Sequence, residues 1–439
     1  MDFNDALDQA VAFSLNNLPH VQEDIYLIRD LQGKIRVLLS RERSNTSPLF
    51  AGVQRLTQDI SGSLDFYTYP EPDIVIYRDR LRNHLDFLNE RSAREMASDG
   101  TYYVYLHDRL LIGGEWDAAY THQASTTPLR FTLFSMKGGV GRSTTAMVLA
   151  KHLAVKGKRV LVFDLDLESP GVGATLLGNE LPAYGIVDWF VEDAVGNAGQ
   201  IIGSMQAESP LQEGLSGFIS VVPAFGADTE DYLSKLGRSY LERGPQGYKP
   251  WPERLKEMVA ANERHYEDTN GCKPDIILFD SRTGLHDSSA ALVLAMGANT
   301  FMFAVDAEQT WRAYRFLFQH WMNHPDIRDF YDKLWIIGSM IPESDSTDHL
   351  ISLRDHSYTL FADTFYQSPA VTGQPRFTPT SSEDDSGNHY PREITWNRGL
   401  MAFEPLANWP DRAVPTAYEQ FLGWFDRAFL TGNEEEADP

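Results

Sequence analysis

The stretch that most constrains this chain is Phe131 to Thr145, which reads FTLFSMKGGVGRSTT. An apolar run that favours a β-strand leads into a glycine-rich turn, and the turn leads into a helical pattern of apolar residues that reaches Leu153. A strand, a glycine-rich turn and a helix in this order are the context that a phosphate-binding loop requires. The stretch therefore predicts a nucleotide-binding site.

The residues of the turn fit this interpretation individually. Gly138, Gly139 and Gly141 let backbone N–H groups curl around an anion without clashes from Cβ atoms. The positive N-terminus of the following helix then faces the same anion. Ser143 offers a hydroxyl oxygen to Mg²⁺. We therefore expect a nucleotide that is bound together with Mg²⁺.

The run from Lys137 to Thr144 resembles the deviant Walker A motif of the ParA/MinD family of ATPases, and is most like a branch whose motif reads KGGVGR. This resemblance implies that Lys137 reaches the phosphates of the partner subunit in a dimer that encloses ATP. Arg142 replaces the lysine that usually stands inside the loop. Arginine keeps the charge, but it is not interchangeable with lysine, so we expect ATP binding and leave efficient hydrolysis open. The residues expected to bind the nucleotide are Lys137, Gly138, Gly139, Val140, Gly141, Arg142, Ser143 and Thr144.

Two aspartates close the next expected strand, in the sequence FDLDLESPG that begins at Phe163. Ligands collect at the carboxyl ends of parallel strands, so these carboxylates are expected beside the phosphate loop. A plain Asx turn needs one aspartate, whereas Asp164 and Asp166 are two residues apart and point to the same face. The pair resembles the D-x-D element of the same family. The resemblance implies that Asp166 positions the attacking water, that Asp164 supports the metal or the loop, and that both act with Lys137 in catalysis.

A third aspartate, Asp280, ends the apolar run IILFD and forms a Walker B pattern. A carboxylate at this position belongs in the Mg²⁺ shell, so the expected metal-binding residues are Ser143, Asp164 and Asp280. The following switch segment contains Gly284, which gives backbone freedom to a γ-phosphate sensor. Arg282 departs from the common family pattern. It either senses phosphate, bridges to a partner, or forms a structural salt bridge.

The adenine-binding residues are expected after the later strands. Pro342 ends the sequence SMIP and can line a base pocket. The segment from Glu393 to Arg398 resembles the family's I-P-[FYW]-[DN] element, with Thr395 in place of proline. Trp396 in this segment either stacks on adenine or packs in a core or an interface.

Two domains are expected. Residues 1–127 read as a small α+β domain with strands at 25–28, 35–39 and 73–77, helices at 49–60 and 78–96, and a second hairpin over 102–112. Residues 128–435 alternate strands and helices, and the strands are near-continuous apolar runs. The expected fold class is α/β, with a mainly parallel, doubly wound sheet of the P-loop (ParA/MinD-like) type. We expect insertions near 176–216 and 238–272, and a mobile loop near 369–391.

Composition limits the cellular context. The net charge of −24 argues against DNA binding through a broad basic face. The single cysteine, Cys272, excludes an internal disulfide framework. We see no signal peptide and no apolar run of 18 residues, so we expect a cytoplasmic protein without a membrane span.

Four hypotheses follow. The preferred one is an ATP-driven switch, a homodimer around ATP and Mg²⁺ that hydrolyses slowly and regulates a partner protein. The context that the resemblance implies is a bacterial multi-gene system such as anti-phage defence. The second is a plasmid-partition type of positioning ATPase, which the acidic charge disfavours. The third is a nucleotide-bound scaffold without hydrolysis. The fourth is a metabolic ligase or amidotransferase-like enzyme, for which we find no second substrate motif.

Overall fold

The structure is a computed structural model. It describes residues 1–41, 49–77, 93–118, 120–121, 128–244, 247–322, 330–344, 346–367, 379–401 and 403–431. The chain divides into two compact units, residues 1–114 and 115–439. Each unit has its own hydrophobic core, so each is treated by itself. None of the described helices combines the length and the apolarity that crossing a membrane requires.

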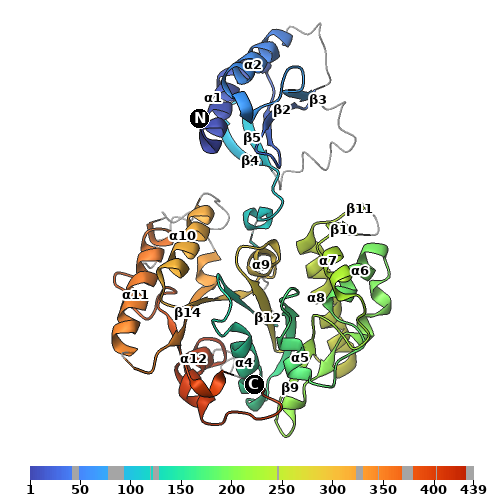
Figure 1. The fold of residues 1–439 in the computed structure, drawn as a ribbon, viewed down its shortest axis with the longest axis vertical. Helices are drawn as coiled ribbons and strands as arrows, with labels where there is room; N and C mark the ends of the chain where they lie inside the picture. The colour runs from blue at the N-terminus through green and yellow to red at the C-terminus, as the bar shows by residue number, and fades with distance from the viewer. Residues whose placement is uncertain are drawn as a thin grey trace, which may run out of the picture. The chain divides into compact units, whose positions relative to one another are not determined.

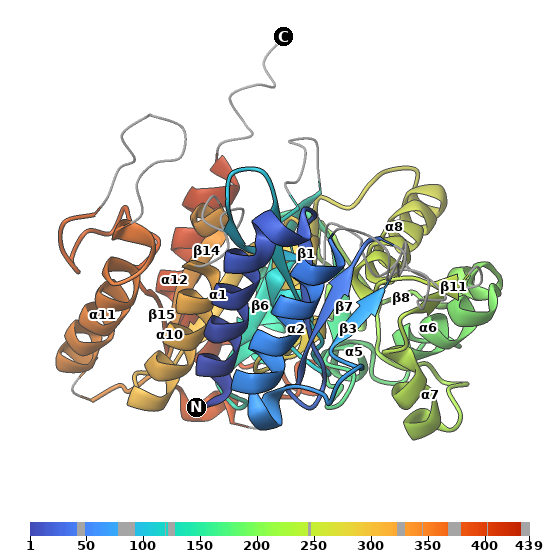
Figure 2. The same cartoon turned by 90° about the horizontal axis from the view of Figure 1, so that it is seen from above.

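The first unit is a five-stranded mixed sheet with two helices. Helix α1 begins after Asp2, whose carboxylate accepts hydrogen bonds from the N–H groups of Asn4 and Asp5 at 2.8 and 2.9 Å. The two helices lie side by side and bury one face of the sheet (Figure 2). The strand order is β3-β2-β1-β5-β4. The elements are α1 (Phe3–Val21), β1 (Ile25–Arg29), β2 (Ile35–Leu39), α2 (Phe50–Ser63), β3 (Val75–Tyr77), β4 (Arg94–Ser98) and β5 (Tyr103–Asp108).

The first hairpin, the helix α2 and the strand β3 confirm the sequence predictions for this unit. The second hairpin was predicted wrongly. It consists of β4 and β5, because the carboxylate of Asp99 accepts from the N–H groups of Thr101 and Tyr102 and so makes the turn there. The expected helix over 78–96 is wrong at its end, where β4 begins. Residues 78–92 lie outside the described part.

The second unit is built on an eight-stranded sheet, in the order β15-β14-β13-β6-β12-β7-β9-β8. Neighbouring strands are parallel except for the short edge pair β8 and β9. This topology confirms the predicted parallel α/β fold. The strands are β6 (Leu129–Ser135), β7 (Arg159–Leu165), β8 (Ala207–Glu208), β9 (Phe218–Val222), β12 (Ile276–Thr283), β13 (Asn299–Ala304), β14 (Leu334–Ile341) and β15 (Arg392–Thr395).

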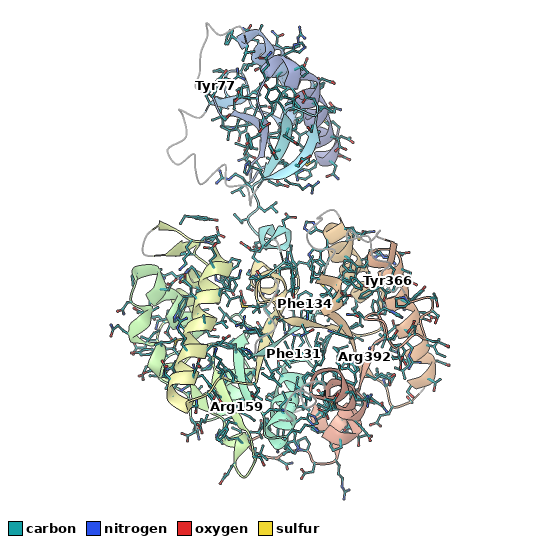
Figure 3. All side chains as sticks on the ribbon, turned by 180° about the vertical axis from the view of Figure 1, so that it is seen from behind. Tyr77, Phe131, Phe134, Arg159, Tyr366 and Arg392 are labelled. Carbon is teal, nitrogen blue, oxygen red and sulfur yellow. The ribbon has the colours of Figure 1, made fainter. Side chains whose placement is uncertain are left out.

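Helices cover both faces of this sheet (Figure 1). Phe131 faces one layer, with its ring 5.0 Å from that of Phe425, while Phe134 faces the other, 6.3 Å from the ring of Tyr314. Both lie at the centre of the unit (Figure 3). One face carries α4 (Arg142–Val155), α5 (Val172–Leu177) and α12 (Ala413–Phe429). The other carries α6 (Ile186–Val195), α8 (Trp251–Asn270), α9 (Asp287–Ala290), α10 (Glu308–Met322) and α11 (Ser346–Ala362).

The two expected insertions contain elements that pack on the sheet. The 176–216 region holds α6, and the 238–272 region holds α8 after the end of α7 (Tyr232–Ser239) and a two-stranded sheet of β10 (Arg243–Gly244) and β11 (Gly247–Tyr248). The mobile loop expected near 369–391 stays a prediction. Its residues 369–378 lie outside the described part, and the end of the segment is attached to the domain, with His389 fully buried and Asn388 donating to the carbonyl of Leu334 at 2.8 Å.

The division between the units falls at Gly114, earlier than the expected boundary at residue 127. Trp116 is buried against Phe134, with ring centroids 5.7 Å apart, and so belongs to the core of the second unit. The N–H of Glu115 donates to the carboxylate of Asp287 at 3.0 Å. The N–H of Thr121 donates to the carbonyl of Leu294 at 2.8 Å. Glu115 and Thr121 are therefore attached to the start of α9 and to the π-helical segment Ala291–Ala295 that follows it.

Candidate functional site: a phosphate loop at the carboxyl edge of the sheet

The phosphate loop joins β6 to α4 at the carboxyl edge of the sheet. Gly139 and Gly141 have φ angles of +73° and +88°, which glycine adopts without strain. A Cβ atom at either position would meet no atom within 4 Å, so the loop surface is open. Within the described chain, the N–H groups of Gly138 to Gly141 donate to no protein acceptor. These donors suit an anion, as the sequence predicts.

Ser143 and Asp280 meet beside this loop. The Ser143 hydroxyl donates to Oδ2 of Asp280 at 2.7 Å. The other oxygen of Asp280 is buried and has no partner within the described residues. Burial raises the pKa of Asp280 to about 6, although Arg142 and the Ser143 hydroxyl act in the opposite direction. A hydroxyl and a carboxylate in this arrangement fit the shell of a Mg²⁺ ion.

Asp164 lies opposite Asp280 on the neighbouring strand β7. Its Oδ2 accepts from the N–H groups of Gly171 and Gly173 at 3.1 and 2.9 Å, so it fixes the turn into α5. Its Oδ1 is buried and, in the described structure, has no partner. Burial, with a smaller contribution from Asp280, raises the pKa of Asp164 to about 7. A metal ion or a cationic ligand would relieve both effects.

Arg142 does not reach into open solvent. Its guanidinium is buried and lies 3.4 Å from the carboxylate of Asp166. Burial raises the pKa of Asp166, and the charge of Arg142 partly offsets this shift. The Nη1 atom of Arg142 is buried and without a partner in the described residues. The loop arginine is therefore held on the aspartate expected to position water, and one of its nitrogens stays available to a phosphate.

Lys137 donates to the side chain of Gln309, near the start of α10. The carbonyl of Lys137 accepts from the Ser135 hydroxyl at 2.7 Å, which fixes the start of the loop. The ammonium group is exposed. It is thus accessible to a group outside its own loop.

The carboxylates and the loop fit a nucleotide with Mg²⁺. The described residues contain no cluster of three or more His, Cys, Asp or Glu side chains that could hold a metal alone. Mg²⁺ in phosphate sites takes few protein ligands, and the phosphates and waters supply the others. Ser143, Asp164 and Asp280 can therefore hold the ion only together with a bound phosphate.

The expected adenine-binding residues lie at the ends of β14 and β15, and no described contact joins them to the phosphate loop. The N–H of Trp396 donates to the carbonyl of Ile341 at 2.7 Å, and its ring is 38% exposed. Pro342 directly follows β14. Met340 has a φ of +57°, an unusual backbone conformation for a residue other than glycine. This end of the sheet is thus exposed and locally strained.

The sequence did not predict the side-chain partners of Arg282 and Lys137. Glu168 pairs with Arg282, and it also accepts a hydrogen bond from the hydroxyl of Tyr240 at 2.7 Å. Only the spacing of Glu168, two residues beyond Asp166, could have indicated that it belongs to the same edge. Gln309, the partner of Lys137, carries no sequence signal.

The comparisons with known proteins agree with this geometry. Residues 131–268 match the model of the CobQ/CobB/MinD/ParA nucleotide binding domain. A 37-residue stretch is 60% identical to the chromosome-partitioning ATPase Soj of Thermus thermophilus, and it covers 8% of this chain and 15% of that relative. The activity and partners of that whole protein therefore cannot be transferred directly.

Two solved structures are similar at low scores. A plasmid partition protein from Borrelia burgdorferi has 18% identity and a TM-score of 0.35 over 54% of this chain and 85% of its own. The pNOB8 ParA bound to nonspecific DNA has 15% identity and a TM-score of 0.34, over 69% of this chain and 94% of its own.

The family assignment therefore rests on the domain match, the loop motif and the strand order. Members of the ParA/MinD family are generally ATPases, and they include proteins of partition and cell-division positioning. Residues 131–268 match the CobQ/CobB/MinD/ParA nucleotide binding domain, and the second unit has the mainly parallel α/β fold of a ParA/MinD-like P-loop domain.

Proposed function

We propose that this chain is a cytoplasmic ATP-binding switch that forms a homodimer around ATP and Mg²⁺, hydrolyses ATP slowly and regulates a partner protein. The observation that carries the proposal is the set of buried polar atoms without partners around the loop, namely Arg142 Nη1, Asp164 Oδ1 and Asp280 Oδ1. Buried polar atoms without partners are rare because each costs free energy. A nucleotide with its metal would satisfy all three.

Each residue then has a role. The loop N–H groups from Gly138 to Gly141 and the guanidinium of Arg142 bind phosphate oxygens. Ser143, Asp280 and Asp164 hold Mg²⁺, which neutralises phosphate charge when it is bound. Asp166 orients the attacking water once Arg142 has moved to a phosphate.

Lys137 contacts the phosphates of the partner subunit. Its exposed ammonium group and its acceptor Gln309, the one side-chain partner it has among the described residues, support this role, since a neutral amide holds a lysine weakly. The partner protein would bind to the first unit or to the inserted elements. The proposed setting is a multi-gene bacterial system such as anti-phage defence.

The test is sedimentation of the wild type and Lys137→Ala without nucleotide, with ADP and with ATP–Mg²⁺, while phosphate release is followed. We expect a dimer that forms only with ATP–Mg²⁺ and is lost in Lys137→Ala. An oligomeric state that does not depend on the nucleotide would contradict the switch. Nucleotide binding measured in the same samples separates a failed dimer from a failed site.

A second candidate is a partition-type positioning ATPase, which the match to Soj favours. This function requires ATP-dependent, salt-sensitive DNA binding. The net charge of −24 disfavours it. Fluorescence anisotropy with a labelled DNA duplex, in ATP and in ADP at two salt concentrations, decides between the two candidates.

A third candidate is a nucleotide-bound scaffold without hydrolysis, which the pairing of Arg142 with Asp166 favours. If this pair persists when ATP binds, Asp166 is not free to orient water. Equal phosphate release from the wild type and Asp166→Ala would support the scaffold and contradict slow hydrolysis.

A further inference from the structure

Three distant parts of the chain meet at Glu168. Its carboxylate pairs with the guanidinium of Arg282, which lies at the carboxyl end of β12. It also accepts from the hydroxyl of Tyr240 at 2.7 Å, and Tyr240 directly follows α7. The side chains of Arg282 and Glu168 are 25% and 30% exposed, so the pair is half-buried and open to competition from another anion.

Arg282 lies next to the phosphate loop. Its neighbour Thr283 pairs with Ser135, the last residue of β6, and the N–H of Gly284 donates to the Ser135 carbonyl at 2.9 Å. A Cβ atom at Gly138 would lie 3.9 Å from the Thr283 side chain. The switch segment that carries Arg282 is therefore in contact with the loop that would hold the phosphates.

The backbone and the side chain of Arg282 are held differently. Its carbonyl accepts from the hydroxyls of Ser281 and Ser289 at 3.0 and 3.1 Å, and this fixes the backbone. The guanidinium, in contrast, is held by Glu168 alone among the described residues. An arginine on a fixed backbone can exchange one anion for another by side-chain rotation.

The charges at this edge favour such an exchange. Four carboxylates gather here, those of Asp164, Asp166, Glu168 and Asp280, against the two guanidinium groups of Arg142 and Arg282. Each arginine already pairs with one carboxylate. Phosphate matches the planar fork of arginine, and charge-assisted bonds to it are strong. A triphosphate with Mg²⁺ therefore competes with the carboxylates for both arginines.

We propose that Arg282 is a second phosphate-binding arginine that selects the γ-phosphate of ATP, and that Glu168, itself bonded to Tyr240, holds its guanidinium until the triphosphate binds. The inference rests on the proposed ATP-binding function and adds a residue that distinguishes ATP from ADP. Tyr240 comes from the region inserted after β9, so this region becomes part of the nucleotide sensor. Arg282 is then neither a purely structural salt bridge nor a bridge to a partner.

The experiment measures the affinities for ATPγS and for ADP, both with Mg²⁺, by isothermal titration calorimetry. We expect Arg282→Ala to lose ATPγS affinity by about 10-fold or more, and to keep the ADP affinity of the wild type. Glu168→Gln should bind ATPγS about 3- to 10-fold more tightly, with ADP unchanged, because the competing charge is gone. Tyr240→Phe should shift ATPγS binding in the same direction by a smaller factor.

The matched control is Arg130→Ala. Arg130 pairs with Glu263 at similar exposure, 21% and 20%, but stands at the opposite end of β6 from the loop. This variant should bind both nucleotides as the wild type does. Thermal unfolding followed by circular dichroism checks that each variant is folded.

Each result of these titrations either supports or contradicts the role of Arg282. Equal losses for ATPγS and ADP in Arg282→Ala would show a structural role and overturn the proposal, and so would wild-type binding of both. If Arg282→Ala does not fold, Glu168→Gln decides, and unchanged ATPγS affinity there overturns the proposal. If the wild type binds neither nucleotide, the proposed ATP-binding function itself fails. A failure of the inference about Arg282 alone differs from this result, because the wild type then still binds nucleotide.

Discussion

An arginine–aspartate pair lies at each end of strand β7, and the two pairs differ in how closely they are hydrogen-bonded. At the amino end, near the rim of the unit (Figure 3), Arg159 binds both oxygens of Asp275, at 3.0 and 2.5 Å, and its N–H donates to the same carboxylate at 2.8 Å. At the carboxyl end, Arg142 and Asp166 touch only at 3.4 Å. Asp164 and Asp280 beside them have buried oxygens without partners in the described structure.

A buried polar atom without a partner costs about 1–3 kcal/mol. At the amino end, the charges are paired with each other. The hydrogen bonds from Arg159 lower the pKa of Asp275 below its usual value despite burial. Under the proposed function, the polar atoms at the carboxyl end are placed for a ligand that brings phosphate and metal. Stability and ligand binding would then depend on opposite ends of one strand.

The largest expected effect is on hydrolysis. Asp166→Ala should lower the rate of phosphate release by about 100-fold or more, because a positioned catalytic group contributes about that much. Asp275→Ala removes an arginine-paired aspartate from the other end of the sheet and should leave the rate per folded molecule unchanged. Phosphate release at saturating ATP measures both. A similar loss in both variants would abolish the distinction between the two ends.

The next effect is on nucleotide affinity. Arg142→Ala should weaken binding of ATP by about 10- to 100-fold, since it removes charge-assisted hydrogen bonds worth about 1.5–3 kcal/mol. Arg159→Ala should bind ATP as the wild type does. Titration with a fluorescent ATP analogue gives both affinities. Unchanged binding by Arg142→Ala would mean that the guanidinium stays on Asp166 when the nucleotide is bound.

For the free energy of unfolding, the larger effect is expected from the pair at the amino end of β7. Arg159→Ala leaves Asp275 half-buried without its cation, so we expect a loss of about 1–3 kcal/mol in the free energy of unfolding. Lys151→Ala removes a cation that is held through a cation–π contact with Trp409, and it should cost about 1 kcal/mol or less. Urea denaturation measures both. Equal values would show that the fully bonded pair gives no special stability.

The smallest effect concerns pH. Burial, followed by the charges of Glu242 and Asp287, raises the pKa of Glu115 from 4.5 to about 7. The folded state therefore holds a proton that the unfolded state has lost, and stability falls as the pH rises from about 4.5 to about 7. Glu115→Gln should be about 1–2 kcal/mol more stable than the wild type at pH 8 and equal to it at pH 4.5.

The control for this prediction is Glu419→Gln, the same chemical change at an exposed position on α12. Urea denaturation of this variant at pH 4.5 and pH 8 should follow the wild type at both values. A gain at pH 8 in both variants would point to the net charge of the chain and not to the surroundings of Glu115.

Local sequence predicted most of this site. The glycine-rich turn, Ser143 and the aspartates at strand ends are defined by residues close together in the chain, and parallel strands bring their carboxyl ends to one edge. The pairing of Glu168 with Tyr240 joins residues 72 positions apart, and no local pattern reports such a contact. The strand β4 was missed because its residues, REMAS, lack the apolar alternation of a strand; its pairing with β5 defines it.

The hydrogen bond from Glu115 to Asp287 has a mechanical consequence. Tension applied along the chain at Glu115 would load its bond to Asp287 at the start of α9. Trp116, buried against β6, would resist as well. Within the described residues, these attachments would take up the load before any strand could be peeled from the sheet.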